Sequence, residues 1–196
     1  AKVLHSRCVE IAKKYGVELL VCSSLNRNSG TMVREKTKME KMLISGVAAD
    51  KNVAKIRVAG LGNDPESTFR LLNLLDRNNL NIDVMIQSLG KDGTKSVSFT
   101  VAKPDMLRTI DVLNDNKDSL GIKKLDYDEN VAKISVIGAG VRSHSGVAAK
   151  MFGALANAGI NTEMITTSEI RITALIDEAY ADQAMRAIHE TFLERV

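Results

Sequence analysis

The sequence lacks tryptophan altogether and has only two prolines, two cysteines and few aromatic residues. Without aromatic residues beside basic clusters, it does not show the pattern typical of nucleic-acid-binding domains. Cys8 and Cys22 form no CxxC pair, which favours reduced thiols in the cytosol over a metal or redox site. No apolar run approaches the roughly 20 residues of a membrane-spanning helix, and no secretory leader is visible. We therefore expect a cytoplasmic protein with no membrane or nucleic-acid partner.

The small net charge of +3 is concentrated at the N-terminal end. Residues 1–41 carry nine Lys and Arg against four Asp and Glu, whereas residues 42–130 and 131–196 each carry one more acidic than basic residue. A surplus confined to one short segment, with no aromatic cluster beside it, is typical of a solvated segment and not of a nucleic-acid-binding surface.

An internal repeat organises the remainder of the chain. Asn52–Gly60 (NVAKIRVAG) recurs as Asn130–Gly138 (NVAKISVIG), and Asn81–Ser88 is matched by Asn161–Ser168. Two matches in the same order, at offsets of 78 and 80 residues, indicate a duplicated structural unit.

Each repeat predicts the order strand, helix, strand, strand, helix, and a last strand follows in the first repeat. In the first repeat, helices are expected after Pro65 and Pro104. The strands around them are expected at Lys55–Leu61, Ile82–Leu89, Val97–Val101 and Ile122–Tyr127. This order is the ferredoxin-like βαββαβ arrangement, an α+β fold with a four-stranded antiparallel sheet and both helices on one face.

The second repeat ends before its fourth strand. Its predicted elements are strands at Lys133–Ile137, Thr162–Thr167 and Ile170–Ile176, and helices at Val147–Ala158 and Ala179–Leu193. A matching strand at residues 42–49 precedes the first repeat, and it would cover the open sheet edge. We therefore expect two intertwined domains, with residues 51–127 as the inserted first domain and residues 42–50 plus 131–196 as the second.

The apolar residues of the first helix, Phe69, Leu71, Leu72 and Leu75, recur at helical spacing. Methionines expected in the core are Met85, Met151 and Met164. Gln87 interrupts an apolar strand, so we expect a buried amide with hydrogen-bond partners.

No catalytic set is visible. The three histidines, His5, His144 and His189, are far apart, and no serine or cysteine has a recognisable nucleophile context. There is no HxxxH motif, no cysteine pair and no Walker-type loop, so we expect neither a metal site nor a nucleotide site. The weak GxG at Gly138–Gly140 belongs to an antiparallel repeat, which argues against a dinucleotide site.

The turns from strand to helix, at Gly62–Glu66 and Gly140–Gly146, favour ligand binding. Each brings backbone N–H groups and a helix N-terminus to one point, an arrangement that suits a carboxylate. Acidic residues in or near the repeats, such as Asp64 and Glu66, would suit an ammonium group, so the pair of charges fits an amino acid. Taken singly, Asn63 and Ser143 are ordinary helix caps.

The chain resembles the tandem ACT domains of aspartokinase over essentially its whole length. The motifs that carry the resemblance are Ile44–Ala48, Gly138–Gly140, Arg142–His144, Gly146–Ala148 and above all Thr166–Arg171 (TTSEIR). The resemblance implies a regulatory region, with residues 1–41 as a remnant of the kinase domain and its linker. It also implies a homodimer through the ACT domains and a catalytic domain or subunit as partner.

The intact enzymes of this family transfer the γ-phosphate of ATP to the side-chain carboxylate of aspartate. Their glycine-rich Lys-Phe-Gly-Gly-Thr-Ser motif does not occur in this chain. The resemblance therefore implies a fragment without catalysis or a cofactor, with ATP and magnesium confined to the kinase domain. An alternative is a free-standing ACT-like sensor that regulates another metabolic enzyme.

The repeat and the resemblance together predict effector sites for lysine, threonine or both, as in feedback control of lysine and threonine biosynthesis. One site is expected to combine Asn63, Asp64, Gln87, Asn161 and Thr162. Its counterpart is expected to combine Asn81, Ile82, Ser143, His144 and Ser145. Further candidates are Glu66, Ser67, Thr167, Ser168 and Glu169. Lysine would need an acidic group at its far end, whereas threonine would need only a small polar pocket.

Overall fold

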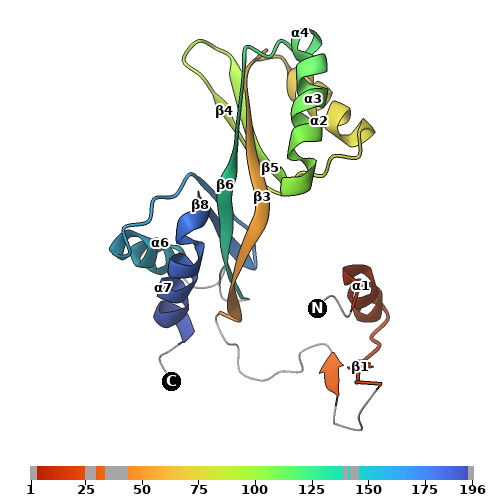
Figure 1. The fold of residues 1–196 in the computed structure, drawn as a ribbon, viewed down its shortest axis with the longest axis vertical. Helices are drawn as coiled ribbons and strands as arrows, with labels where there is room; N and C mark the ends of the chain where they lie inside the picture. The colour runs from red at the N-terminus through yellow and green to blue at the C-terminus, as the bar shows by residue number, and fades with distance from the viewer. Residues whose placement is uncertain (1–3, 25–29, 34–43, 139–140, 142–145, 194–196) are drawn as a thin grey trace. The chain divides into compact units, whose positions relative to one another are not determined.

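The computed structural model describes residues 4–24, 30–33, 44–138, 141 and 146–193 (Figure 1). The chain divides into two compact units, residues 1–41 (the N-terminal unit) and residues 42–196 (the sheet unit). All the candidate effector residues belong to the sheet unit.

The described residues of the N-terminal unit, 4–24 and 30–33, form one helix and a two-stranded sheet. Helix α1 (Ser6–Lys14) begins after His5, whose Nδ1 accepts a hydrogen bond from the Arg7 N–H at 3.2 Å. Strand β1 (Leu19–Val21) pairs antiparallel with β2 (Thr31–Val33). Large apolar side chains that stay exposed in this unit are Leu4, Val9, Ile11, Tyr15, Val17, Leu20 and Met32.

The sheet unit is built on two long central strands, β3 (Gly46–Leu61) and β6 (Lys124–Ile137), which lie side by side in Figure 1. The outer strands are β4 (Met85–Leu89), β5 (Lys95–Ala102), β7 (Met164–Thr167) and β8 (Arg171–Asp177). The six form one sheet in the order β4-β5-β3-β6-β8-β7, and every pairing is antiparallel.

Both central strands run through segments that the sequence divides into two strands. Residues 50–52 and 128–130 are polar, which suggested a break, but in the structure they form irregularities within continuous strands. The Asn52 N–H donates to Asp50 Oδ1 at 2.9 Å, and the Asn130 N–H donates to Asp128 Oδ1 at the same distance. A side-chain acceptor thus replaces a ladder partner at each bulge, so the strand continues past the polar residues.

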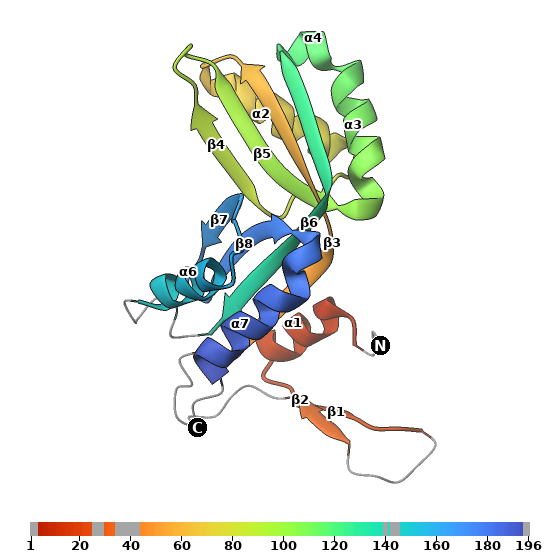
Figure 2. The same ribbon diagram turned by 60° about the vertical axis from the view of Figure 1, so that its left-hand side comes forward.

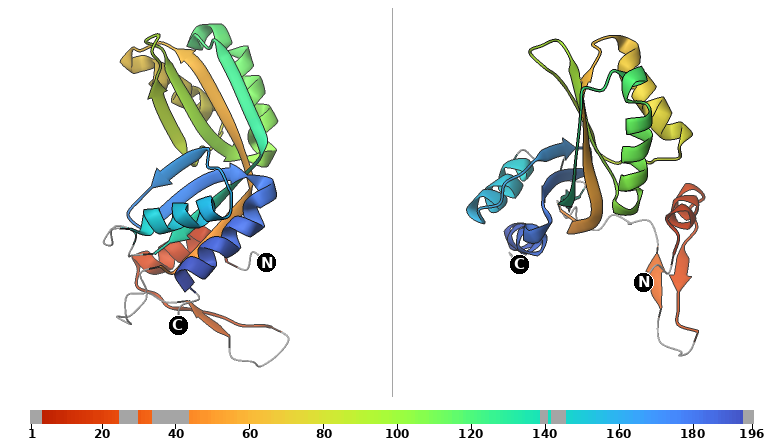
Figure 3. Two further views of the ribbon diagram at one scale, coloured as in Figure 1. Left: turned by 90° about the vertical axis from the view of Figure 1, so that its left-hand side faces the viewer. Right: turned by 45° about the horizontal axis from the view of Figure 1, so that its top comes forward.

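The long strands let one sheet serve two helix layers, which Figures 2 and 3 show on opposite faces. The first half of the sheet, β4-β5-β3-β6, carries α2 (Pro65–Arg77), η1 (Lys103–Asp105), α3 (Met106–Asp115) and α4 (Lys117–Leu120). The second half, β3-β6-β8-β7, carries α6 (Val147–Asn157), η2 (Glu178–Tyr180) and α7 (Ala181–Leu193). Each half has four antiparallel strands and two main helices on one face, which confirms the predicted α+β fold.

The alternation of side chains along β3 explains why the helix layers lie on opposite faces. Ile56 and Val58 point into the core beneath α2 and α3, whereas Val47 and Ala49, of the opposite parity, pack against the core beneath α6 and α7. A third cluster joins the two halves and contains Val53, Val131, Met164 and Leu175, with Val84 and Ile86 packed against it.

Residues 46–50 of β3 pair with residues 133–137 of β6, so the strand that precedes the first repeat lies beside the first strand of the second repeat. This pairing gives the second half its fourth strand. Gly121, with φ of 71°, ends α4 and returns the chain to β6; a residue with a Cβ would be strained in this left-handed conformation.

Two predictions of burial are wrong. Met85 is 40% exposed and Gln87 is exposed as well, because β4 is an edge strand with a neighbour on one side only. Phe69 is 64% exposed on α2, two residues away from the buried Leu71 and therefore about 200° round the helix. Met151 and Met164 are buried, as predicted.

Candidate functional site

Five of the candidate residues lie in or beside the first turn of α2. Asp64 is the N-cap: its Oδ1 accepts the Ser67 N–H at 2.8 Å and its Oδ2 accepts the Ser67 hydroxyl. Thr68, in the same turn, donates from Oγ1 to Gln87 Oε1 of β4 at 2.6 Å. Asn63, expected from the sequence as a helix cap, precedes the actual cap Asp64. Asn63, Asp64, Glu66, Ser67 and Gln87 thus lie around one helix N-terminus.

The electrostatics of this turn keep Asp64 ionised. The Ser67 hydroxyl, the Ser67 N–H and the Arg70 guanidinium lower the pKa of the Asp64 carboxyl below its usual range. Its side chain remains 45% exposed, and Lys95 Nζ lies 2.7 Å from the Asp64 carbonyl oxygen. A carboxylate has about four lone-pair sites, so the two hydrogen bonds of the cap leave acceptor capacity for an incoming ammonium group.

Gly62 explains how the turn closes so tightly. A Cβ on this residue would lie 2.5 Å from Asp64 Oδ2 and 2.9 Å from Ser67 Oγ. Any larger residue would therefore displace the cap. The close approach of the backbone to a helix N-terminus is an arrangement that suits an anion such as a carboxylate.

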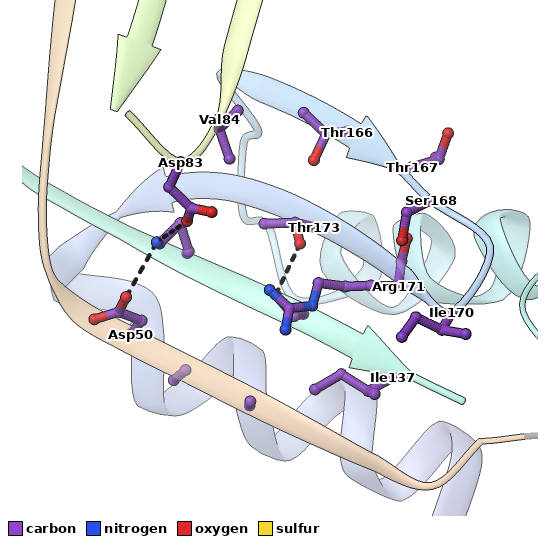
Figure 4. Close-up of a pocket in the computed structure, with 14 residues that line it drawn as sticks. Asp50, Asp83, Val84, Ile137, Thr166, Thr167, Ser168, Ile170, Arg171 and Thr173 are labelled. Carbon is purple, nitrogen blue, oxygen red and sulfur yellow. Dashed lines mark hydrogen bonds and ion pairs between the residues drawn. The ribbon is translucent and has the colours of Figure 1, made fainter. Parts of the chain in front are cut away.

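A second candidate region lies where the two halves of the sheet meet (Figure 4). It is a cavity of about 470 Å³ on the face of the second half that points away from α6 and α7. The hydroxyls and charges that line it are Asp50, Asp83, Lys133, Ser135, Thr166, Thr167, Ser168, Arg171 and Thr173. An adjoining cavity of about 320 Å³ shares Asp50, Asp83 and Lys133 and is lined by Asn81 and Ile82.

Lys133 is the central charge of this region. Its Nζ lies 3.1 Å from Asp50 Oδ2 and also pairs with Asp83, and its side chain is only 14% exposed. Partial burial lowers the pKa of Lys133, but the hydrogen bonds and charges of the two aspartates outweigh burial and hold that pKa above its usual value. For Asp50, partial burial raises the pKa of the carboxyl. The hydrogen bond from the Asn52 N–H and the contact with Lys133 outweigh burial, and the pKa of Asp50 is lowered.

The structure brings together some of the predicted site residues and separates others. Thr167 and Ser168 line the larger cavity and Asn81 and Ile82 the smaller one. Asn161 and Thr162 precede β7 in the second half, and within the described residues no hydrogen bond joins them to the α2 turn. Glu169 lies between β7 and β8, whereas Ser143, His144 and Ser145 lie outside the described residues.

Lys133, Asp50 and Asp83 are not among the site residues expected from the sequence. A clue was available, because Lys133 and Lys55 occupy the same position in the two repeats, and so do Asp83 and Glu163. In the part of the chain that the structure describes, no group of three or more His, Cys, Asp or Glu residues could hold a metal ion. None of the described helices is long and apolar enough to cross a membrane.

Comparison with known proteins places these features in a family. The ACT domain family matches residues 134–192. The aspartokinase of Pseudomonas aeruginosa is 38% identical over 98% of this chain but over 47% of its own length. The chain thus spans about half the length of the curated relatives it matches.

Solved structures give the same family with nearly complete coverage of the matching chain. A chain from a crystal structure of aspartokinase alpha and beta subunits is 42% identical, with a TM-score of 0.71, over 76% of this chain and 98% of that chain. The ligand-free regulatory subunit of aspartate kinase from Thermus thermophilus is 33% identical, with a TM-score of 0.72, over 76% and 99%.

A more distant structure contains an amino acid. Aspartokinase III of Escherichia coli, solved in complex with lysine and aspartate, is 23% identical with a TM-score of 0.76, over 98% of this chain and 42% of that chain. At this identity the likeness establishes a shared fold.

Proposed function

The chain belongs to the aspartokinase family, within the ACT-domain regulatory part of these enzymes, and from this we propose that it binds an amino-acid effector and thereby controls the phosphorylation of L-aspartate by ATP. The observation that carries the proposal is the near-complete coverage of the Thermus thermophilus regulatory subunit, 99% of which this chain matches at 33% identity. The chain would set the activity of a catalytic domain or subunit without performing phosphotransfer itself.

We propose lysine, threonine or both as effectors, in feedback control of lysine, threonine and methionine biosynthesis. Two features support an amino acid: the partial positive charge at the α2 N-terminus suits a carboxylate, and Asp64 and Glu66 offer negative charge to an ammonium group. The lysine found with the Escherichia coli enzyme supports the choice of ligand class. The binding residues would be those of the two predicted sites, with residues 51–127 as one ACT domain and residues 42–50 plus 131–196 as the other.

Regulation would follow from a population shift. An effector can move a two-state equilibrium only if it binds one arrangement more tightly than the other. The two ACT domains share β3 and β6, so a change in one is mechanically connected to the other. Residues 1–41 would carry the change to the kinase, and their exposed apolar side chains are the surface available for that contact.

A nucleic-acid-binding role for this fold would need exposed aromatic rings on the sheet. Phe99 is the one phenylalanine that the sequence places clearly on a strand, and its side chain is fully buried beneath the helix layer of the first half. Bases stack on exposed aromatic rings, so Phe99 cannot supply that contact.

Thermal denaturation against the twenty amino acids, diaminopimelate and ATP with magnesium tests the proposed function. Lysine or threonine should stabilise the chain by about 2.7 kcal/mol when present at about 100 times its dissociation constant. ATP with magnesium should leave the melting temperature unchanged, because the glycine-rich motif of the kinase is not in this sequence. Micromolar ATP binding, or no response to any amino acid, would contradict the proposal.

We also propose a homodimer formed through the ACT domains. β4 and β7 are the outer strands of the sheet, and each presents one unpaired edge within the described part of the chain. Side-by-side pairing with a second copy would cover such edges. Sedimentation equilibrium at tens of micromolar, with lysine or threonine present, should give twice the chain mass of 21.3 kDa, and a monomer would overturn the proposal.

A further inference from the structure

Two ion pairs cross between the halves of the sheet, and the internal repeat relates one pair to the other. Lys55 and Lys133 are equivalent residues of the two repeats, and Asp83 and Glu163 are equivalent as well. Lys55 Nζ pairs with Glu163 Oε2, whereas Lys133 Nζ pairs with Asp83 Oδ2. Each lysine therefore binds the acidic residue of the opposite repeat.

The partners of each pair come from elements with different roles. Lys55 and Lys133 project from the central strands β3 and β6, which are shared by both halves. Asp83 and Glu163 lie just before the outer strands β4 and β7, immediately after the candidate effector residues Ile82 and Thr162. The lysine of one repeat thus touches the segment that enters the outer strand of the other.

The same two acidic residues are also bound to their own half. The Asp83 N–H donates to the Thr100 carbonyl oxygen at 3.1 Å, and the Glu163 N–H donates to the Leu175 carbonyl oxygen at 2.8 Å. Backbone hydrogen bonds therefore join each segment to its own half, while the ion pair joins it to the other half.

A third contact follows the same symmetry. Lys103 Nζ lies 2.8 Å from Glu178 Oε2, and these residues directly follow β5 and β8, the equivalent strands of the two halves. The apolar cluster between the halves also pairs equivalent residues, Val53 with Val131. The two halves are therefore related by an approximate twofold axis, and the two ion pairs are its symmetric copies.

The lysines of the crossing pairs are less exposed than the lysine of an ordinary surface pair, although their partners Glu163 and Asp83 are 34% and 56% exposed. The lysine side chains are 24% exposed at Lys55 and 14% at Lys133, against 43% for Lys51, which pairs with Asp182. Shielded pairs are screened less by salt and hold their geometry better than exposed pairs. Lys51 therefore provides a matched control: a lysine of the same strand, in an ion pair that does not contact either effector segment.

We propose that Lys55 and Lys133 are positioning residues that each hold the effector segment of the opposite repeat, so that the two effector segments of one chain are coupled through reciprocal ion pairs. That these segments bind an effector rests on the proposed function. That the two lysines hold the segments in position does not. A ligand that moves residues 81–83 would act through Lys133 on β6, the central strand of the second repeat. By thermodynamic linkage the reverse coupling must be equally strong.

Hydrogen exchange of the unliganded chain tests the positioning directly. Lys133→Met keeps the aliphatic stem and removes the charge, so amide exchange at residues 81–84 should become several-fold faster. Lys55→Met should instead speed exchange at residues 161–164. Lys51→Met should change neither segment. Unchanged exchange at both segments in folded Lys55 and Lys133 variants would overturn the proposal.

A general loss of structure must be separated from a loss of positioning. The conservative variants Asp83→Asn and Glu163→Gln remove the same pairs from the acidic side and should reproduce the two exchange patterns, segment by segment. The charge swap Lys55→Glu with Glu163→Lys should restore slow exchange at residues 161–164. Faster exchange spread evenly over the chain, without rescue by the swap, would assign a purely structural role and overturn the proposal.

Isothermal titration with lysine and with threonine tests the coupling. If the parent chain binds either ligand, Lys133→Met and Lys55→Met should each weaken binding by about fivefold or more, while Lys51→Met should not. Equal affinities in all four proteins would contradict the coupling. A parent that binds neither ligand would contradict the proposed function instead, and the exchange experiment would still decide the positioning.

Discussion

Truncation of Phe99 to alanine should lower the free energy of unfolding by about 3–5 kcal/mol. Phe99 lies on β5, between Ile56 and Met85 of the neighbouring strands, and its side chain is fully buried in the core beneath α2 and α3. The loss combines the transfer free energy of the ring with the cavity that rigid neighbours would leave behind.

Urea denaturation followed by circular dichroism measures this loss, at one fixed protein concentration because self-association would add to the apparent stability. Phe69→Ala is the matched control: the substitution is the same, but Phe69 is 64% exposed on α2. It should change the free energy of unfolding by no more than about 0.5 kcal/mol. Similar losses for both variants would show that the core of the first half is not packed as described.

The contrast between these two phenylalanines shows what helical spacing could decide. Phe69 recurs at helical spacing with the leucines of α2, yet the buried residues of this helix are Ser67, Leu71 and Leu75, spaced four apart. A strict spacing of four excludes Phe69 from the core, since two residues correspond to about 200° of helix.

The α+β fold was predictable because the pattern of strand, helix, strand, strand, helix occurs twice in the sequence. The repeat of the NVAKI segment located the central strands, and Pro65 and Pro104 marked the beginnings of helices. What could not be predicted was the continuity of β3 and β6. It depends on bulges in which Asp50 and Asp128 side chains replace ladder partners, and polar residues in a sequence do not distinguish a bulge from a turn.

The candidate site was predictable only where it is local. Asp64 and Ser67 are three residues apart at the start of a helix, a spacing that predicts a cap. The pairs of Lys55 with Glu163 and of Lys133 with Asp83 span 108 and 50 residues. Their partners are set by how the two halves pack across the third apolar cluster, and no spacing rule contains that information.

The second large effect concerns the effector site. Asp64→Asn should weaken lysine or threonine binding about tenfold or more, because an ammonium group would lose a charged hydrogen-bond acceptor. Asparagine caps helices as well as aspartate does, so the substitution should leave α2 intact. Titration calorimetry would measure the affinity, and far-ultraviolet circular dichroism would confirm that the helix content is unchanged.

Two further variants separate the charge of Asp64 from its capping role. Asp64→Ala removes both, so it should lose effector binding and also lower the melting temperature without ligand. Asp92→Asn is the control, because Asp92 is likewise a carboxylate whose pKa is lowered by hydrogen bonds from Thr94, but it lies in the turn between β4 and β5. It should bind the effector like the parent. If the parent binds an amino acid and Asp64→Asn and Asp64→Ala bind it equally well, the α2 turn is not the effector site.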